Sequence, residues 1–163
     1  MSEAVKPIPE GFHTVTPQLV CGNALQALEF YKNALGAEII HVAKDDSGKV
    51  MHADFKVGDS MVMLSDEFPE YHCLSPRSLG GTGVTLHIYT PDADAAFAKA
   101  VNAGAKVTMP IMDAFWGDRY GQVEDPYGHR WSIATRKRVP TEEEIRSAMK
   151  AFAEKSKEKS AGG

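Results

Sequence analysis

An internal repeat constrains the fold of this 163-residue chain more than any other feature of its sequence. Residues 23–28, NALQAL, recur as DADAAF at 92–97, an offset of 69 residues. Residues 33–37, NALGA, match NAGA at 102–105 after one deletion. Such a repeat means that one supersecondary unit occurs twice. Each half is too small to bury a full core alone, so we expect the two halves to share a sheet.

The first half of the repeat has the pattern of a strand, a helix and three further strands. Residues 13–21 suit a strand that has Pro17 at an edge or irregularity of the sheet. Asn23 can cap a helix that ends at Gly36, because apolar residues follow at helical spacing in between. Hairpin-like turns then separate three expected strands, at 37–44, 50–57 and 60–65.

The second half repeats this order. Residues 84–89 alternate between apolar and polar side chains, which predicts a strand. Asp92 or Asp94 can cap a helix that ends at Gly104. Three more strands are expected, at 106–112, 119–124 and 129–135. The sequence therefore predicts an α+β fold made of two βαβββ modules.

The domain organisation follows from these patterns. We expect an N-terminal arm over residues 1–12 and a repeat domain over 13–138, in which a loop at 66–82 links module one (13–68) to module two (83–138). Thr141 and Glu144 form a capping box, and Ile145, Met149 and Phe152 make an apolar stripe. We therefore expect a C-terminal helix over 139–155 that packs on the body or on a partner, followed by a disordered tail at 156–163.

Composition excludes several classes of function. The formal charge is −4, with no basic block in the body of the chain, which argues against nucleic acid as a partner. No apolar run approaches the roughly 20 residues that span a bilayer, and the charged, proline-containing N-terminus does not resemble a signal peptide. We therefore expect a cytoplasmic protein with no membrane partner. Two cysteines are too few for a disulfide framework.

Strand geometry selects the first candidate pocket residues. Side chains at i and i+2 share a face of a strand, so Thr85, His87 and Tyr89 point away from the apolar residues between them. The same reasoning directs His52 and Asp54 to the polar side of another strand. Each histidine is either a hydrogen-bonded strand residue or a metal ligand, and nothing in the spacing demands the second reading.

The loop 115–121, FWGDRYG, is the most unusual stretch of the chain. Trp116 can stack on a planar group, Arg119 can clamp an anion, and Tyr120 can donate a hydrogen bond. The alternative is a hairpin corner in which Trp116 plugs the end of the sheet and Asp118 pairs with Arg119.

Several motifs together carry a family resemblance: A-L-x-F-Y-x-x-x-L-G-A at 27–37, M-L-S-D-E at 63–67, A-G-A-K-V at 103–107, W-G-D-R-Y-G at 116–121 and D-P-Y-G-H-R-W at 125–131. With the duplicated βαβββ plan, they resemble the vicinal oxygen chelate superfamily, and within it the PhnB-like branch of the glyoxalase/bleomycin-resistance/dioxygenase group. The similarity covers about residues 13–138, so the C-terminal helix lies outside it. It implies a U-shaped mixed sheet around a pocket, commonly in a homodimer.

The resemblance also implies where a metal would bind. The metal enzymes take one ligand from the first and last strand of each module, and those positions fall on Thr16, Met63, Thr85 and Ser132. None of them is a histidine or a glutamate, and hydroxyls and a thioether hold hard divalent ions poorly. We therefore expect no metal and no cofactor, a divalent ion being possible only at an atypical site that involves His52 or His87.

Two functions follow. The favoured one is a metal-free protein that binds a small molecule, in a sequestration or resistance role. The expected pocket residues are Thr16, Gln18, Met63, Thr85, His87 and Ser132, closed over by Trp116, Arg119 and Tyr120. The alternative is a glyoxalase- or dioxygenase-type enzyme, that is a lyase, isomerase or oxygenase, with an atypical metal site or with His87 as its catalytic general base. We expect a homodimer in either case, because the fold leaves sheet edges to cover.

Overall fold

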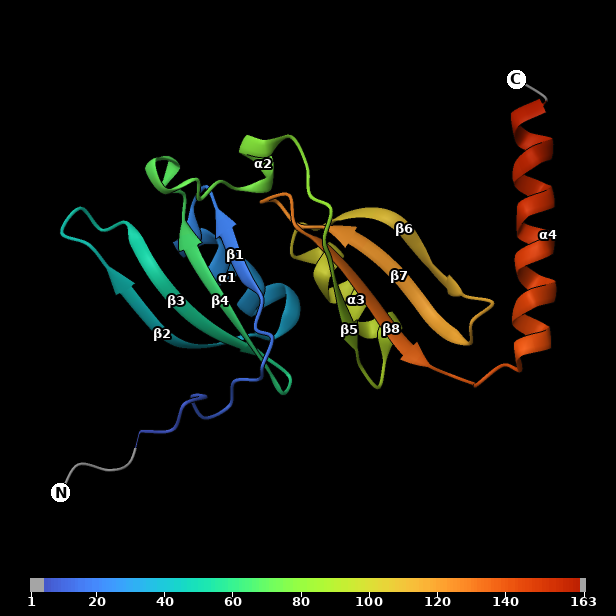
Figure 1. The fold of residues 1–163 in the computed structure, drawn as a ribbon, viewed down its shortest axis with the longest axis horizontal. Coiled ribbons are helices and arrows are strands. Elements are labelled where there is room, and N and C mark those ends of the chain that lie inside the picture. The colour runs from blue at the N-terminus through green and yellow to red at the C-terminus, as the bar shows by residue number, and fades with distance from the viewer. Residues whose placement is uncertain (1–4, 162–163) are drawn as a thin grey trace.

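The computed structural model describes residues 5–161 and shows two βαβββ modules followed by one long helix (Figure 1). The first module contains β1 (Gln18–Cys21), α1 (Ala24–Leu35), β2 (Glu38–Lys44), β3 (Val50–Val57) and β4 (Ser60–Asp66). The second contains β5 (Thr85–Tyr89), α3 (Ala93–Asn102), β6 (Lys106–Asp113), β7 (Asp118–Glu124) and β8 (Arg130–Arg136). The loop between them carries a short 3-10 helix (Pro69–Tyr71) and α2 (Pro76–Leu79), and α4 (Glu142–Ala161) follows the second module.

Both modules have the same sheet topology. The strand orders are β1-β4-β3-β2 and β5-β8-β7-β6, with β1/β4 and β5/β8 parallel and the remaining pairs antiparallel. The predicted α+β class and the two βαβββ modules are thus confirmed. The expectation that the two halves share one sheet is wrong, because strand pairing stays within each module and gives two four-stranded sheets.

The residues that the sequence predicts as helix caps form those caps in the structure. The Asn23 side chain accepts a hydrogen bond from Gln26 N at 3.1 Å, and Gly36 ends α1 with φ of +65°, a backbone conformation that favours glycine. Asp92 caps α3 in the same way, since its carboxylate accepts from Ala95 N at 3.0 Å.

The two modules also share one hydrogen bond that the sequence repeat does not show, because different residue types form it. The Asp66 carboxylate accepts from Ala24 N at 2.7 Å, where α1 begins. The Thr135 hydroxyl accepts from Ala93 N at 2.8 Å, where α3 begins. Both residues of the second pair follow those of the first by 69 positions. The last strand of each module therefore anchors the start of that module's helix.

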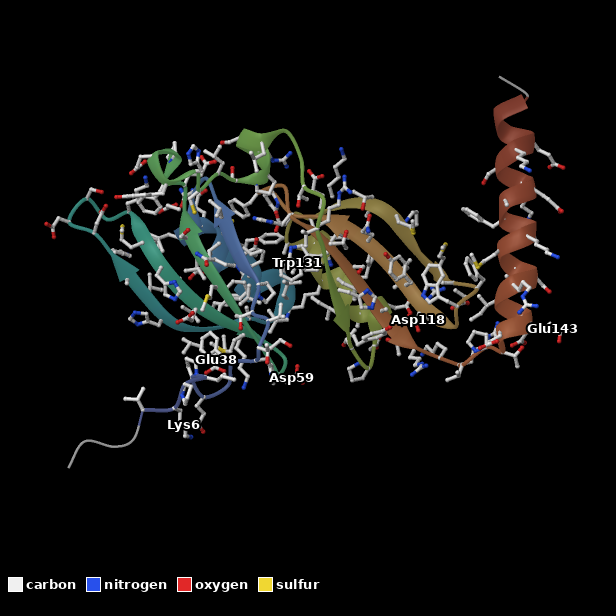
Figure 2. All side chains as sticks on the ribbon, viewed as in Figure 1. Lys6, Glu38, Asp59, Asp118, Trp131 and Glu143 are labelled. Atoms are coloured by element: carbon white, nitrogen blue, oxygen red, sulfur yellow. The ribbon has the colours of Figure 1, made fainter. Side chains whose placement is uncertain are left out.

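One core joins the two modules. Helix α1 packs against α3, and the Tyr31 ring of α1 stacks on Phe55 at 5.0 Å between centroids. Tyr31 also crosses to the second module, where its hydroxyl donates to the buried carboxylate of Asp125 at 2.7 Å. Figure 2 shows Trp131 at this junction, and its indole Nε1 donates to the same carboxylate at 2.9 Å. A buried carboxylate shared in this way fixes how the modules sit against each other.

The structure corrects two predicted boundaries. The first strand begins at Gln18 rather than at 13, because Pro17 cannot donate to the sheet and Thr16 instead bonds back to the His13 carbonyl. Helix α4 continues to Ala161, so the predicted end at 155 is too early and residues 156–161 are helical rather than a disordered tail. Their straight-chain charged residues favour a helix once one has begun. The final two glycines, and residues 1–4 of the predicted arm, lie outside the described residues.

The expected capping box at the start of α4 is present. Thr141 Oγ1 accepts from Glu144 N at 3.2 Å, and the Glu144 carboxylate accepts from Thr141 N at 2.7 Å. Within residues 5–161, no helix combines the length and the apolar character that crossing a membrane requires.

Candidate functional site

The second sheet presents polar and aromatic side chains on the face that α3 does not cover. Helix α3 packs on the other face, where the Phe97 ring lies against Gly121 of β7. Strand pairing aligns the residues of the open face into rows: His87 pairs with Ser132, and Tyr89 pairs with Ala134, which pairs in turn with Tyr120. These rows bring side chains from β5, β7 and β8 together.

Four rings form an aromatic cluster on this face: His87, Tyr89, Trp116 and Tyr120. The His87 ring lies 4.5 Å from that of Tyr89, edge-on, and 6.0 Å from that of Tyr120, nearly parallel. The Trp116 ring meets Tyr120 edge-on at 5.2 Å. Tyr89 is 65% exposed and Trp116 is 36% exposed. The aromatic cluster thus offers ring faces and edges on which a planar group can stack.

Buried polar groups hold three of these rings in place. Asp118, only 5% exposed, accepts from Trp116 Nε1 at 3.1 Å and from the Tyr89 hydroxyl at 3.4 Å. Ser132 Oγ and His87 Nδ1 are hydrogen-bonded at 2.6 Å. Among the described residues no group bonds the other His87 nitrogen, Nε2, so this atom remains for a ligand.

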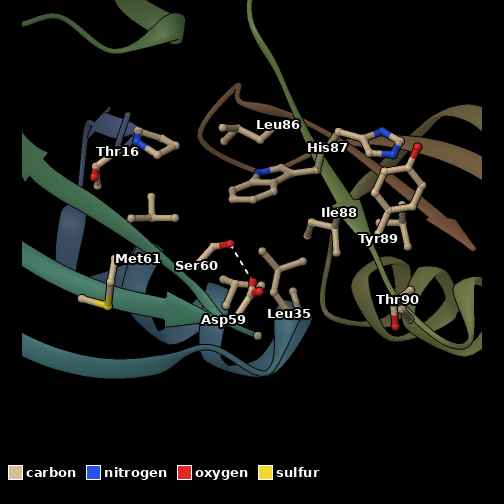
Figure 3. A pocket seen from close by; sticks show the side chains of 18 of the residues that line it. Thr16, Leu35, Asp59, Ser60, Met61, Leu86, His87, Ile88, Tyr89 and Thr90 are labelled. Carbon is tan, nitrogen blue, oxygen red and sulfur yellow. Dashed lines mark hydrogen bonds between the residues drawn. The ribbon is translucent and has the colours of Figure 1, made fainter. Parts of the chain in front are cut away.

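A cleft of about 790 Å³ lies between the modules and reaches the aromatic cluster (Figure 3). We call it the intermodule cleft. Its apolar wall comes from both modules: Leu35, Val57, Met61, Leu86, Ile88 and Trp131. Thr16, Asp59 and Lys99 add polar groups. His87 and Tyr89 line this cleft where it meets strand β5, and both also belong to the aromatic cluster.

The structure brings together five of the residues that the sequence selects. His87, Ser132, Trp116 and Tyr120 belong to or support the aromatic cluster, and Thr85 lies on the same strand face.

Three other candidates lie apart from the aromatic cluster. Thr16 lines the intermodule cleft. Gln18 and Met63 are paired neighbours in the first sheet and do not line that cleft.

Arg119 points to the opposite face of β7. Its guanidinium donates to the Asp94 carboxylate in the first turn of α3 at 2.9 Å and lies 3.4 Å from Asp113. The hydrogen bond from Arg119 holds the pKa of Asp94 below its usual range. Arg119 is thus occupied by carboxylates of its own chain, and the alternative pairing with Asp118 is absent as well. Alternation along the strand explains both findings, because Asp118 and Tyr120 share the open face.

The expected pocket residues left out two members of the site, Tyr89 and Asp118. Alternation along the strand had already placed Tyr89 on the same face as His87, two positions earlier. Asp118 looked like an ion-pair partner for its neighbour. Its role as the acceptor for two rings depends on a contact with β5 that no local pattern encodes.

The donors at the implied metal positions do not suit a metal centre. Those positions are Thr16, Met63, Thr85 and Ser132, and the strand pairing sets Gln18 beside Met63 and His87 beside Ser132. Three hydroxyls and a thioether are a poor donor set for a hard divalent ion, and one neighbouring imidazole and one amide do not complete it. In the described part of the chain, no three His, Cys, Asp or Glu side chains converge, and His52 bonds only Asp54, at 2.9 Å. We therefore derive no chemistry through a metal.

Comparison with known proteins places this geometry in context. The sequence profile of the Glyoxalase/Bleomycin resistance protein/Dioxygenase superfamily matches residues 11–133. An uncharacterized protein of Mycobacterium tuberculosis strain H37Rv is 41% identical over 138 residues, which are 83% of this chain and 81% of that protein.

Solved structures share the fold. The product of the Arabidopsis thaliana gene At5g48480 superposes with a TM-score of 0.60 at 30% identity, over 76% of this chain and 98% of its own. A PhnB protein from Bacillus cereus superposes with a TM-score of 0.59 at 18% identity, over 76% of this chain and 99% of its own. Helix α4 lies beyond the residues that the profile matches.

Proposed function

Because this chain belongs to the Glyoxalase/Bleomycin resistance protein/Dioxygenase superfamily, we propose that it is a metal-free protein that binds a small molecule on the aromatic cluster. One observation carries the proposal: the rings of His87, Tyr89, Trp116 and Tyr120 gather on the uncovered face of a rigid sheet, over a buried carboxylate. Aromatic side chains held in fixed positions on a sheet lose little freedom when a ligand stacks on them.

The chemistry of the site favours a ligand with a planar ring and one hydrogen-bonding atom. The ring would stack on Trp116 or Tyr120, and the polar atom would meet Nε2 of His87. An apolar substituent could extend from there into the intermodule cleft. Arg119 gives no support to an anionic ligand, because it is engaged by Asp94 and Asp113.

We place this binding function in the cytoplasm and in a homodimer, with sequestration of a toxic compound as its role. Exposed apolar side chains on both sheets support the dimer, namely Ile40 and Met51 in the first and Met109 and Met112 in the second. Exposed apolar surface of this kind is typical of a surface that a partner covers.

The proposal can be tested with a planar dye, proflavine, whose own fluorescence anisotropy reports binding in every variant, and with intrinsic fluorescence of the unchanged protein. Trp116 is exposed and Trp131 is buried, so dye stacked on the aromatic cluster should quench chiefly the Trp116 emission. The variants Trp116→Leu and Tyr120→Leu should each weaken dye binding about fivefold, since aromatic stacking contributes about 1 kcal/mol. Tyr71→Leu, at an exposed tyrosine in the first module, is the matched control. Unchanged binding by the Trp116→Leu/Tyr120→Leu double variant would refute the proposal.

A second candidate is the enzyme in which His87 acts as a general base. The 2.6 Å bond to Ser132 orients the imidazole and leaves Nε2 toward the open face, as a base requires. This function predicts that the protein catalyses deuterium uptake from D2O into a ketone substrate and that His87→Gln abolishes the uptake. A panel of α-hydroxyketones followed by mass spectrometry would provide the measurement.

A further inference from the structure

A free arginine stands on the same sheet face as the aromatic cluster. Arg130 begins β8 two residues before Ser132, so alternation along the strand places both side chains on the face that α3 leaves uncovered. Arg130 is exposed, and none of the carboxylates that the structure describes bonds its guanidinium. Two residues along a strand span about 6.6 Å, so the long arginine side chain can reach toward His87, the neighbour of Ser132.

The charges around Arg130 leave this end of the face positive. Glu124 lies opposite Arg130 in the strand pair, but its carboxylate is already 3.2 Å from the Arg77 guanidinium of α2. Two guanidinium groups therefore share one carboxylate, which leaves one positive charge unbalanced. A single excess positive charge suits a ligand group with one negative charge.

Two further hydrogen-bonding groups lie next to Arg130. Thr85 is its partner on β5, and the exposed Thr85 hydroxyl bonds no other side chain among the described residues. His87 lies one row further along the sheet, and its Nε2 carries the proton when the Ser132 hydroxyl donates to Nδ1. A guanidinium, a hydroxyl and an imidazole N–H can all donate to a carboxylate.

We propose that the ligand is a planar aromatic acid whose carboxylate is bound by Arg130, an inference that rests on the proposed binding function. The ring of the acid stacks on Tyr120 or Trp116, and its carboxylate lies between His87 and Arg130. The rows of the sheet place these groups in that order, because Tyr120 pairs with Ala134, His87 pairs with Ser132, and Arg130 comes next along β8. A bidentate bond between carboxylate and guanidinium fixes the orientation of the acid.

The opposite end of this face is less suited to an anion. Arg136 lies there, on the same face of β8, and is exposed as well. It pairs with Asp118, whose carboxylate accepts from the Trp116 and Tyr89 side chains. A ligand carboxylate placed beside Arg136 would be repelled by Asp118. Arg130 is therefore the arginine that we assign to the ligand.

Isothermal titration calorimetry with 2-naphthoate and its uncharged amide, 2-naphthamide, tests this assignment. The acid should bind about fivefold more tightly than the amide, a ratio typical of one exposed ion pair. Arg130→Gln should lower the ratio to about one. Arg130→Lys should keep part of it, because lysine retains the charge and loses the bidentate geometry. Arg136→Gln, on the same strand and the same face, is the matched control and should leave the ratio unchanged.

Proflavine binding separates a wrong ligand class from a wrong binding function. Proflavine is a cation, so Arg130→Gln should not weaken its binding, and this result also shows that the variant site is folded. If proflavine binding depends on Trp116 while the acid and the amide bind equally, the ligand class is wrong and the binding function stands. Binding of neither naphthalene compound would overturn the assignment too. An equal loss of the ratio in Arg130→Gln and Arg136→Gln would indicate an effect of net charge alone and would also overturn it.

Discussion

The carboxylate of Asp125 is the most consequential polar group of the core, and Tyr31→Phe tests its role. Asp125 is 1% exposed. One of its oxygens accepts from Tyr127 N at 2.9 Å and His129 N at 3.0 Å, which shapes the turn before β8. The other accepts from the Tyr31 hydroxyl at 2.7 Å and Trp131 Nε1 at 2.9 Å, which joins the modules. A buried carboxylate is tolerated because all four donors converge on it.

The expected change in the free energy of unfolding follows from the hydrogen bonds that each variant removes. Tyr31→Phe removes the hydrogen bond to the Asp125 carboxylate and a long contact of 3.9 Å with Cys21 Sγ but keeps the ring packing, so it should lower the free energy of unfolding by about 2 kcal/mol. Asp125→Ala leaves the Tyr31 hydroxyl and the Trp131 N–H buried without an acceptor and should cost at least about 4 kcal/mol. For a chain of this size, about 2 kcal/mol corresponds to a fall in Tm of about 4–8 °C.

Urea unfolding followed by tryptophan fluorescence measures the free energy of unfolding of each variant. Tyr71→Phe is the control at an exposed tyrosine and should change stability by less than about 0.5 kcal/mol. A cost below about 0.5 kcal/mol for Tyr31→Phe itself would refute the reasoning, because a bond of 2.7 Å to a buried charge cannot then be holding the modules together.

Three further predictions concern other parts of the fold. Gly121→Ala should destabilise the protein by about 1–3 kcal/mol in the same urea assay, because the added methyl group would lie 2.6 Å from the α3 phenyl ring. Iodoacetamide at pH 8 should label Cys73 and leave Cys21 unlabelled by mass spectrometry, since Cys21 is buried and burial raises the pKa of its thiol. The Ser78 hydroxyl, together with other hydrogen bonds, lowers the pKa of Glu67. A lowered pKa contributes stability above the unfolded value of about 4.3 that is lost as pH falls through the folded value, so stability measured from pH 5 to 3 should decline less steeply in Glu67→Gln.

Local chemistry made much of the fold predictable. Asn23 and Gly36 delimit α1 because a side-chain acceptor and a left-handed residue are needed where helix hydrogen bonds end. The 69-residue offset predicted the second module from the first, and alternation along β5 placed His87 on the open face. These signals depend on residues close together in the chain.

Contacts between distant residues were not predictable in the same way. Asp125 begins a D-P-Y-G turn that reads as an ordinary surface hairpin, yet its carboxylate is buried by Tyr31, 94 residues earlier. The face of Arg119 depends on the register of β7 against β8. Arg119 pairs with Thr135, whose hydroxyl bonds the start of α3, so Arg119 lies on the α3 face and reaches Asp94.

The two modules keep one backbone plan but differ in the chemistry of their open faces. Where the second sheet pairs His87 with Ser132, the first pairs Gln18 with Met63. In the neighbouring strands, Gln122 pairs with Ser132 and Asp54 pairs with Met63, so Gln122 and Asp54 occupy equivalent positions. Two residues earlier, the first module has His52 where the second module has Tyr120.

Only the second module therefore carries the rings of the aromatic cluster. The anchor at the start of each helix is kept in both modules, by a carboxylate in one and a hydroxyl in the other, because every such helix needs an acceptor there. No comparable structural need keeps aromatic side chains on an uncovered face. Their concentration in one module is what the proposed ligand site requires, and this asymmetry makes the second sheet the main contact surface in that proposal.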